Sequence, residues 1–432
     1  MKVTSSCGVE IRKQNICFRK TMDIYRRAVM YLTEQLDTVW EELSGIENVR
    51  RRFNAAEHMV HTTKNNRARF DFDRQFPKMP SYLRRSAIQA ALGTVTSCRS
   101  RRKPGKPYLP KETHAMPVFY REAMYREGEK GSDLAYLKLY DGHDWIWREV
   151  RLLHTDMEYL RKNWSHEKAS APRLEKKHRK YYLRFSFEEQ VELTQTPAGK
   201  QKICAVDLGI NTDAVCSIMT GDGTVLARRF ISFPGDKDQI SHVLGRIRRK
   251  QREHGSSCRG LWKYAVRLNE EVAKKTAGEI VRFAKENQAD VIVFEHLEMK
   301  GKIRGSRKQR IHLWRKRDVQ KRCEHLAHRN GMRISRVCAW NTSALAFDGS
   351  GKVERDPGNR RLCVFPNGKR YNCDLSASYN IGARYFIREL LKPLPETARS
   401  LLEAKVPAAM RRTSCVYADL LAMKDTISRM TA

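Results

Sequence analysis

Three acidic residues lie in sequence settings where carboxylates could carry out chemistry. Asp207 and Glu295 each end a short apolar run, and Asp374 opens a segment (374–384) whose composition favours a helix. The ends of strands are where open α/β sheets place their reactive groups. Three carboxylates gathered at such an edge would offer only hard oxygen ligands, which are the ligands that Mg²⁺ and Mn²⁺ prefer.

The charge of the chain indicates what such a site would act on. The 432 residues include 84 Lys and Arg against 49 Asp and Glu, a formal net charge of +35 spread along the whole length. A surplus of this size predicts a polyanionic partner. Ribosomal and histone-like proteins are usually shorter, and this chain has 41% hydrophobic residues with which to build cores. We therefore expect a large nucleic-acid enzyme, because divalent ions held by carboxylates are suited to phosphodiester hydrolysis.

The cysteines and the hydropathy predict a cellular location. The 11 cysteines are an odd number without any Cys-x-x-Cys pair, which is typical of reduced thiols in the cytosol. No apolar run approaches the length of a membrane span, and residues 1–7 lack the apolar core of a signal peptide. These features predict a soluble, cytoplasmic protein without a membrane partner.

The N-terminal half alternates between two kinds of periodicity. Residues 21–99 show helical spacing around a polar and basic stretch, and a strand is expected within 1–20. Alternating apolar and polar residues predict further strands at 116–125, 134–140, 145–153 and 176–187. This half is interpreted as a small β-barrel, built from 1–20 and 100–195, that a helical segment interrupts.

The C-terminal half begins after a boundary at residues 196–200. A three-stranded meander starts with the strand that ends on Asp207, and a long helical region leads to the strand that ends on Glu295. A further helix and strand follow, then an irregular stretch, and the helix that Asp374 opens. This is the order of elements in the RNase H-like fold, so the predicted class is an α/β multidomain protein.

Three motifs resemble a known family. Asp-Leu-Gly-Ile-Asn at 207–211, Phe-Glu-His-Leu at 294–297 and Asn-Cys-Asp-Leu-Ser-Ala-Ser-Tyr-Asn-Ile-Gly-Ala-Arg at 372–384 resemble the RuvC motifs of transposon-encoded TnpB nucleases. They equally resemble those of the related miniature type V (subtype V-F-like) CRISPR-associated effectors. The resemblance covers about 200–392 and implies that Asp207, Glu295 and Asp374 are the metal-binding catalytic triad, with Mg²⁺ or Mn²⁺ as cofactor.

The same resemblance implies a domain plan. The expected domains are a RuvC nuclease domain at 200–340 and 374–392, a zinc-ribbon-like insertion that binds target nucleic acid at 341–373, a wedge-type β-barrel at 1–20 and 100–195, a helical recognition insert at 21–99, and a C-terminal tail at 393–432.

The ribbon departs from the pattern of the family. Asn341-Thr342-Ser343 resembles the Tyr-Thr-Ser signature that opens the zinc ribbon, but the usual Cys-x-x-Cys pairs are missing. Only Cys338, Cys363 and Cys373 lie near, whereas a structural zinc site needs four ligands. We expect a ribbon that has lost its zinc and still guides strands through basic residues, which are Arg355, Arg360, Arg361, Lys369 and Arg370.

A dense basic run at 300–317 follows Glu295. It is interpreted as a lid or strand contact, and the alternative is a basic loop that is merely solvated. The predicted nucleic-acid contacts, within this run and the insertion, are Arg304, Arg307, Lys308, Arg310, Trp314, Arg360, Arg361 and Arg370.

The function implied by the resemblance is guide-RNA-directed DNA cleavage at a Mg²⁺-dependent RuvC site. The partners would be a guide RNA and double-stranded and single-stranded target DNA. A homodimer on one guide and a single acting chain both remain open. The alternatives are an RNA-guided DNA-binding repressor without cleavage, a guide-independent RNase H-like nuclease or resolvase, and a general RNA-binding protein.

Overall fold

The computed structural model describes residues 1–13, 15–101, 108–129, 131–164, 169–255, 257–296, 316–359, 361–410 and 413–431. The chain divides into two compact units. The N-terminal unit is Lys2–Glu189, and the sheet unit comprises Met1 and Gln190–Ala432. Each unit has its own buried core. The predicted α/β multidomain class is therefore confirmed.

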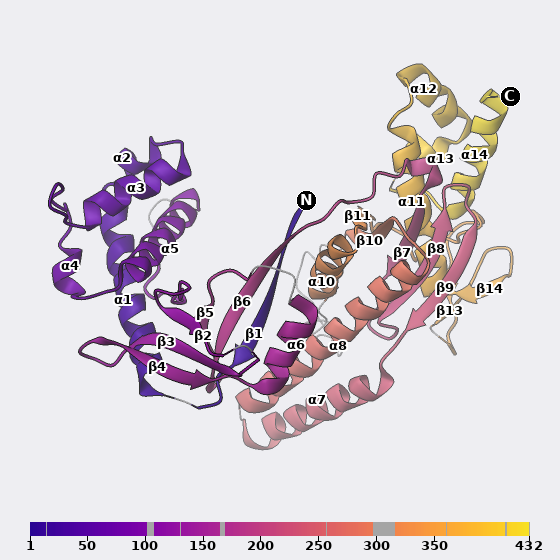
Figure 1. Cartoon of the computed structure of the whole chain (residues 1–432). Helices are drawn as coiled ribbons and strands as arrows, with labels where there is room; N and C mark the ends of the chain where they lie inside the picture. Colours follow the sequence, from indigo (N-terminus) through magenta and orange to yellow (C-terminus); the bar gives the residue numbers. More distant parts are fainter. Residues whose placement is uncertain are drawn as a thin grey trace. The chain divides into compact units, whose positions relative to one another are not determined.

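The N-terminal unit combines helices with two small sheets (Figure 1). One sheet has the order β1-β6-β5 and the other the order β2-β3-β4. Its strands are β1 (Lys2–Glu10), β2 (Tyr125–Glu127), β3 (Leu134–Tyr140), β4 (Trp145–Arg151), β5 (Arg173–Lys177) and β6 (Lys180–Gln190). Its helices are α1 (Ile16–Thr38), α2 (Trp40–Ser44), α3 (Val49–Val60), α4 (Phe72–Gln75), α5 (Ser81–Ser100) and α6 (His154–Trp164).

Helix α1 shows how the sequence sets the start of this helical layer. The Asn15 side chain accepts a hydrogen bond from the backbone N–H of Cys17, at 2.9 Å, and so caps the first turn. Apolar residues at helical spacing, from Phe18 through Tyr25 to Leu36, are then buried in the core of the unit.

Two of the sequence predictions for this unit need correction. A strand over 116–125 is wrong, because Glu122 adopts a left-handed conformation (φ 63°) and turns the chain, so β2 begins only at Tyr125. The stretch 49–78, expected to be merely polar and basic, contains α3 and α4. An isolated bridge between Ile11 and Leu152 joins the two sheets, while closure into a wedge barrel stays a prediction.

The sheet unit is built around five strands in the order β11-β10-β7-β8-β9. Strands β7 (Lys202–Asp207), β8 (Ala214–Thr220) and β9 (Val225–Ile231) form the predicted antiparallel meander. Strands β10 (Val291–His296) and β11 (Arg333–Cys338) run parallel to β7. The other elements before residue 340 are η1 (Ala198–Lys200), α7 (Pro234–His254), α8 (Arg259–Glu286) and α10 (Lys316–Arg329).

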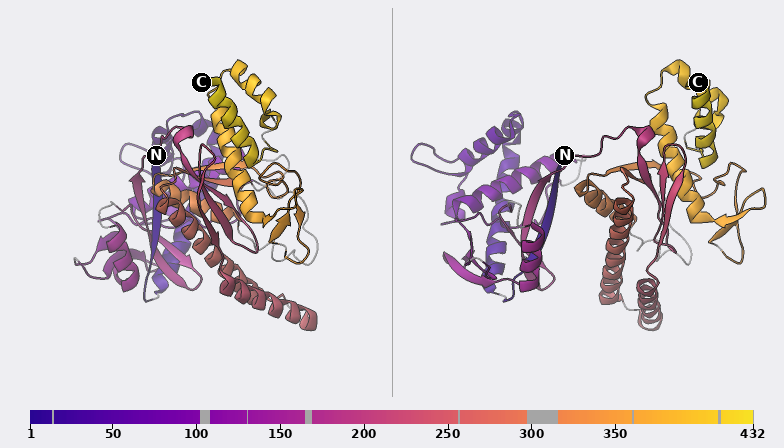
Figure 2. Two further views of the ribbon diagram at one scale, coloured as in Figure 1. Left: turned by 90° about the vertical axis from the view of Figure 1, so that its right-hand side faces the viewer. Right: turned by 45° about the vertical axis from the view of Figure 1, so that its right-hand side comes forward.

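Helices cover both faces of this sheet (Figure 2). Alternate strand residues such as Cys204, Val206 and Phe294 pack with α8 and α10. The intervening residues, such as Ala205 and Val293, pack instead against α11 (Cys373–Leu391). The period of two along the central strands therefore directs successive side chains to opposite helical layers.

The C-terminal segment, predicted as a tail at 393–432, forms part of the core. It contains α12 (Glu396–Lys405), α13 (Pro407–Met410) and α14 (Tyr417–Thr431). Leu402, Leu420 and Met423 are fully or almost fully buried in the core that includes α11. Without these apolar side chains, part of α11 would be exposed to water. Their burial against α11 therefore explains why this segment folds.

The insertion before α11 is a small separate layer. Three short strands, β12 (Glu354–Arg355), β13 (Leu362–Val364) and β14 (Arg370–Asn372), form an antiparallel sheet in that order. Its own core contains Ala346, Cys363, Phe365 and Cys373. The stretch expected to be irregular is thus partly a β-structure.

Candidate functional site

Asp207 lies at the end of the central strand, and the loop that follows is tightly fixed. A Cβ on Gly209 would lie 2.6 Å from the carbonyl oxygen of Thr212, so only glycine fits this turn. Lys237 of α7 donates to the carbonyl oxygens of Ile210 (3.1 Å) and Asn211 (2.5 Å). It also pairs with Asp213 at 2.9 Å. The Asp-Leu-Gly motif therefore serves to bend the chain directly after the carboxylate.

The register of the sheet brings Glu295 to the same edge as Asp207. Phe294 of β10 is the parallel partner of Val206 of β7, so the next residues along the two strands are Glu295 and Asp207. Phe294 and Val206 point toward the core beneath α8. Alternation therefore directs both carboxylates to the other face, which α11 covers.

Asp374 reaches this face from the first turn of α11. The Asn372 side chain caps the helix by accepting from the backbone N–H of Leu375 at 2.9 Å. The Thr212 hydroxyl, from the loop after β7, donates a hydrogen bond that lowers the pKa of Asp374. This contact ties the helix that carries the third carboxylate to the loop that follows the first.

The electrostatics show that Glu295 and Asp374 lie near enough to Asp207 for their charges to act on it. Burial raises the pKa of Asp207 well above its ordinary value, and the negative charges of Glu295 and Asp374 raise it further. Burial also raises the pKa of Glu295 and of Asp374. The Arg355 cation of the insertion opposes the rise at both aspartates. A cation placed among these side chains would relieve both their burial and their repulsion.

The donor set fits a divalent cation. All three side chains offer carboxylate oxygens, the ligands that Mg²⁺ and Mn²⁺ prefer. As placed, no three His, Cys, Asp or Glu side chains of the described ranges are close enough together to hold a metal ion. Two carboxylates are engaged locally, since the Thr342 hydroxyl donates to Glu295 Oε1 and Thr212 donates to Asp374. The assignment of these residues as metal ligands therefore stays a prediction.

Glu295 is held by groups that the spacing of the carboxylates did not reveal. Its side chain is only 8% exposed, and the carboxylate accepts from Thr342. The Gln320 amide of α10 donates to its backbone carbonyl at 2.9 Å. The positive charges of Arg384 and Lys316 lower its pKa and so oppose the effect of burial. Glu295 is thus oriented from three different elements.

Helix α11 supplies two buried polar side chains that fix the surroundings of the site. Asn380 donates to the carbonyl oxygens of Thr342 and Leu345, each at 3.0 Å, and accepts from the backbone N–H of Tyr417. Arg384, only 3% exposed, donates to the carbonyl oxygens of Cys338 (2.7 Å), Trp340 (2.7 Å) and Cys415 (2.9 Å).

The sequence contains a signal for these two residues. Asn380 and Arg384 are four residues apart, on one face of a helix that is largely buried, and polar groups buried in such a helix need partners. Gly382 lies between them, and a Cβ there would collide with Met219 Sδ and lie 3.3 Å from Ala205 Cβ. The Asn-Ile-Gly-Ala-Arg motif therefore brings α11 close to the sheet and anchors the turn after β11.

The predicted nucleic-acid contacts are only partly visible. Arg304, Arg307, Lys308, Arg310, Trp314 and Arg360 lie outside the described residues. Arg361 and Arg370 are exposed on the insertion. Arg361 lies near enough to Asp374 for its charge to lower the pKa of that carboxyl, whereas Arg370 pairs with Asp356 at 3.8 Å. Arg355, which was expected to guide strands, is the insertion residue whose charge acts on both aspartates.

The three cysteines considered for zinc do not share one environment. Cys363 and Cys373 are buried together in the core of the insertion, and their thiols are hydrogen-bonded to each other. Cys338 is exposed at the end of β11. Burial raises the pKa of Cys373 to about 12, which disfavours the thiolate that zinc requires. Whether the protein holds zinc stays a prediction.

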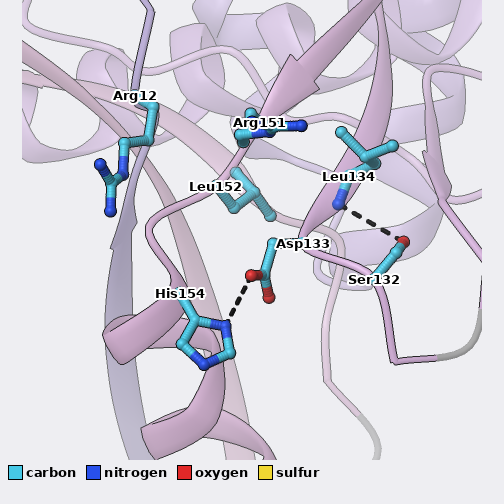
Figure 3. A pocket seen from close by; sticks show the side chains of 7 residues that line it. All are labelled: Arg12, Ser132, Asp133, Leu134, Arg151, Leu152 and His154. Atoms are coloured by element: carbon cyan, nitrogen blue, oxygen red, sulfur yellow. Dashed lines mark hydrogen bonds and ion pairs between the residues drawn. The ribbon is translucent and has the colours of Figure 1, made fainter.

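A hollow of about 430 Å³ lies in the N-terminal unit (Figure 3). Arg12, Arg151 and His154 line it around Asp133, together with Ser132, Leu134 and Leu152. Asp133 accepts from His154 Nδ1 at 2.7 Å and pairs with Arg161 at 3.1 Å. The cationic side chains outnumber the single carboxylate, so this hollow is suited to an anionic group.

In the part of the chain that the structure describes, no helix is both long and apolar enough to cross a membrane.

Comparison with known proteins gives partial matches. The Aq_aa04 family model matches residues 5–141. The TnpB-like protein aq_aa05 of Aquifex aeolicus (strain VF5) is 29% identical over 153 residues, which is 32% of this chain. The chain spans about half the length of that curated relative, 50%.

Solved structures also match. A Cas12f1–sgRNA–target DNA complex has 16% identity, covers 76% of this chain and 73% of that chain, and has a TM-score of 0.46. Alicyclobacillus acidoterrestris C2c1 with single-guide RNA has 10% identity, covers 84% and 65% of the two chains, and has a TM-score of 0.44. The match to aq_aa05 is in line with the TnpB resemblance of the three motifs, since over 153 residues this chain is similar to a TnpB-like protein.

Proposed function

We propose that this protein is a guide-RNA-directed DNA endonuclease that hydrolyses phosphodiester bonds at a Mg²⁺- or Mn²⁺-dependent RuvC site. The observation that carries the proposal is that the sheet register places Glu295 beside Asp207, and that burial and the charges of Glu295 and Asp374 raise the pKa of Asp207. The strand order β11-β10-β7-β8-β9, with one antiparallel meander and two further parallel strands, supports an RNase H-like nuclease domain.

The three carboxylates would hold the divalent ions, and bound ions of this kind activate water and stabilise the leaving oxygen of a phosphodiester. The residues of the chain prepare that site. Lys237 and Gly209 fix the bend after Asp207, and Thr342 orients Glu295. Burial raises the pKa of all three carboxyls, and the charges of Glu295 and Asp374 raise that of Asp207 further; a bound divalent cation would relieve both effects.

Two arginines of the insertion would bind the negatively charged phosphates of the nucleic acid. The charges of Arg355 and Arg361 both lower the pKa of Asp374, and that of Arg355 also acts on Asp207, so both arginines lie on the Asp374 side of the site. An arginine in this place can bind a phosphate oxygen with two parallel hydrogen bonds. We therefore assign Arg355 and Arg361 to holding the nucleic-acid backbone over the site.

The net charge of +35 supports a large nucleic-acid partner. Phosphate contacts by many Lys and Arg residues make binding steeply dependent on salt, and a structured RNA would use them over several surfaces. The hollow between Arg12 and Arg151 is our candidate for one such RNA phosphate contact. The sequence relationship to a TnpB-like protein favours a guide RNA over other RNA partners.

The test is to express the protein with its native flanking DNA, sequence the RNA that co-purifies, and use that RNA to direct cleavage. We expect one enriched RNA species, and Mg²⁺-dependent cleavage of a matching DNA that EDTA abolishes. A repeat–spacer transcript would place the protein in a CRISPR system, and an RNA from one transposon end would place it with a transposon.

Two outcomes would overturn the proposal in different ways. RNA-directed DNA binding without cleavage in Mg²⁺ or Mn²⁺ would make the protein an RNA-guided binder. Metal-dependent cleavage without any enriched RNA would make it a guide-independent RNase H-like nuclease.

A further inference from the structure

Trp340 is the most exposed aromatic side chain among the residues that the structure describes, with 68% of its surface accessible. It lies in the turn directly after β11, the edge strand beside the strand that carries Glu295. A tryptophan side chain can bury 150–250 Å² when it finds a partner, roughly the largest contribution of any residue. An indole left in water at this position therefore requires an explanation.

The backbone of Trp340 is held firmly although its side chain is exposed. The buried Arg384 guanidinium donates through one nitrogen, Nη1, to the carbonyl oxygens of Trp340 and Cys338, each at 2.7 Å. A side chain on a fixed backbone loses less conformational entropy when it binds a ligand than one on a mobile loop. The turn thus presents the indole in a defined place.

The turn also links the indole to the carboxylate site. Asn341 adopts a left-handed conformation (φ 59°), which asparagine tolerates better than most residues, and so reverses the direction of the chain. Thr342 is then buried, with 3% exposure, and its hydroxyl donates to Glu295. The exposed ring is therefore two residues from the group that orients a proposed metal ligand.

The surroundings favour a nucleobase as the partner. The adjacent site pairs carboxylates with the cations of Arg355 and Arg361, a combination suited to a phosphodiester backbone. Aromatic side chains beside such a backbone path bind unpaired bases by stacking, and every base offers a π-face. We propose that Trp340 is a stacking platform for an unpaired nucleobase of the single-stranded DNA that enters the carboxylate site.

This inference deepens the proposed function and rests on it for the identity of the substrate. Its test measures binding and not cleavage, so the two can fail separately. The protein, with the RNA that co-purifies, is titrated in EDTA with a short single-stranded DNA that has no complementarity to that RNA. A second oligonucleotide of the same length carries abasic sites throughout and keeps only the phosphate backbone.

We expect Trp340→Ala to weaken binding of the normal oligonucleotide about 5- to 100-fold and to leave binding of the abasic one unchanged. Trp340→Phe should retain most of the affinity because it keeps an aromatic face. Phe230→Ala is the matched control, since Phe230 is 51% exposed on β9, at the opposite edge of the same sheet. It should change neither affinity.

Equal weakening of both oligonucleotides by Trp340→Ala, or no weakening of either, would overturn the proposal. A loss confined to the normal oligonucleotide would support the stacking platform even if Mg²⁺-dependent cleavage were never observed. In that case only the proposed cleavage activity would be withdrawn.

Discussion

The carboxylate site of the sheet unit and the hollow of the N-terminal unit use polar side chains in opposite ways. In the sheet unit, Asn380 and Arg384 are buried, and each binds two or more backbone carbonyl groups around the carboxylates. In the N-terminal unit, Arg12 and Arg151 line an open hollow and expose their charge. The comparison suggests that a site for chemistry needs groups fixed in position, whereas a surface for a polyanion needs mainly charge.

This difference also explains what the sequence could reveal. The carboxylate site was predictable because Asp207 and Glu295 end apolar strands and Asp374 begins a helix, and each pattern is local. The same local patterns predicted the meander, the parallel strands and α11. The hollow beside Asp133 was not predictable, because its residues come from β3, β4, the start of α6 and the segments next to β1, β3 and β4, and share no motif.

The largest effect is expected from a substitution that disturbs the close packing of the sheet unit. Gly382→Ala should destabilise the protein by about 1–3 kcal/mol, because the new methyl group collides with Met219 between α11 and the sheet. Chemical denaturation followed by circular dichroism measures this change.

Gly278→Ala is the matched control for that substitution. Gly278 lies within α8, and an added Cβ would meet no atom within 4 Å. It should stabilise the protein by about 0.5–1 kcal/mol, because alanine favours a helix more than glycine does. Similar effects of the two substitutions would contradict the claim that α11 is pressed against the sheet at Gly382.

The second prediction concerns how the raised pKa of Asp207 changes the stability of the protein with pH. The pKa of Asp207 in the folded protein lies well above the ordinary 3.8, so the unfolded chain releases this proton at lower pH than the folded one. The metal-free wild-type protein therefore loses stability as pH rises from the unfolded pKa toward the folded one. Asp207→Asn removes that loss and should raise the melting temperature in EDTA by a few degrees near neutral pH.

The gain should shrink as the pH is lowered and vanish below 3.8, where the wild-type carboxyl is protonated in both states. Thermal unfolding of both proteins in EDTA across a pH series measures it. Mg²⁺ should then stabilise the wild type more than the variant. A melting temperature of Asp207→Asn that is lower than that of the wild type at every pH would contradict the proposed repulsion.

The smallest effect is expected in the N-terminal unit. Replacing both Arg12 and Arg151 with Ala should weaken RNA binding several-fold and reduce the salt dependence of the affinity by about one phosphate contact for each arginine. Arg74→Ala is the control, because Arg74 of α4 is equally exposed and pairs only loosely with Asp71, at 3.7 Å. An unchanged salt slope for the double variant would remove this hollow from the RNA path.

Cleavage by three single variants tests the central claim most directly. Asp207→Ala, Glu295→Ala and Asp374→Ala should each reduce Mg²⁺-dependent, RNA-directed DNA cleavage to background while leaving binding of RNA and target DNA nearly intact, because the proposed role of these carboxylates is to hold metal. Cleavage at the wild-type rate by any one of the three would show that these carboxylates are not the catalytic site.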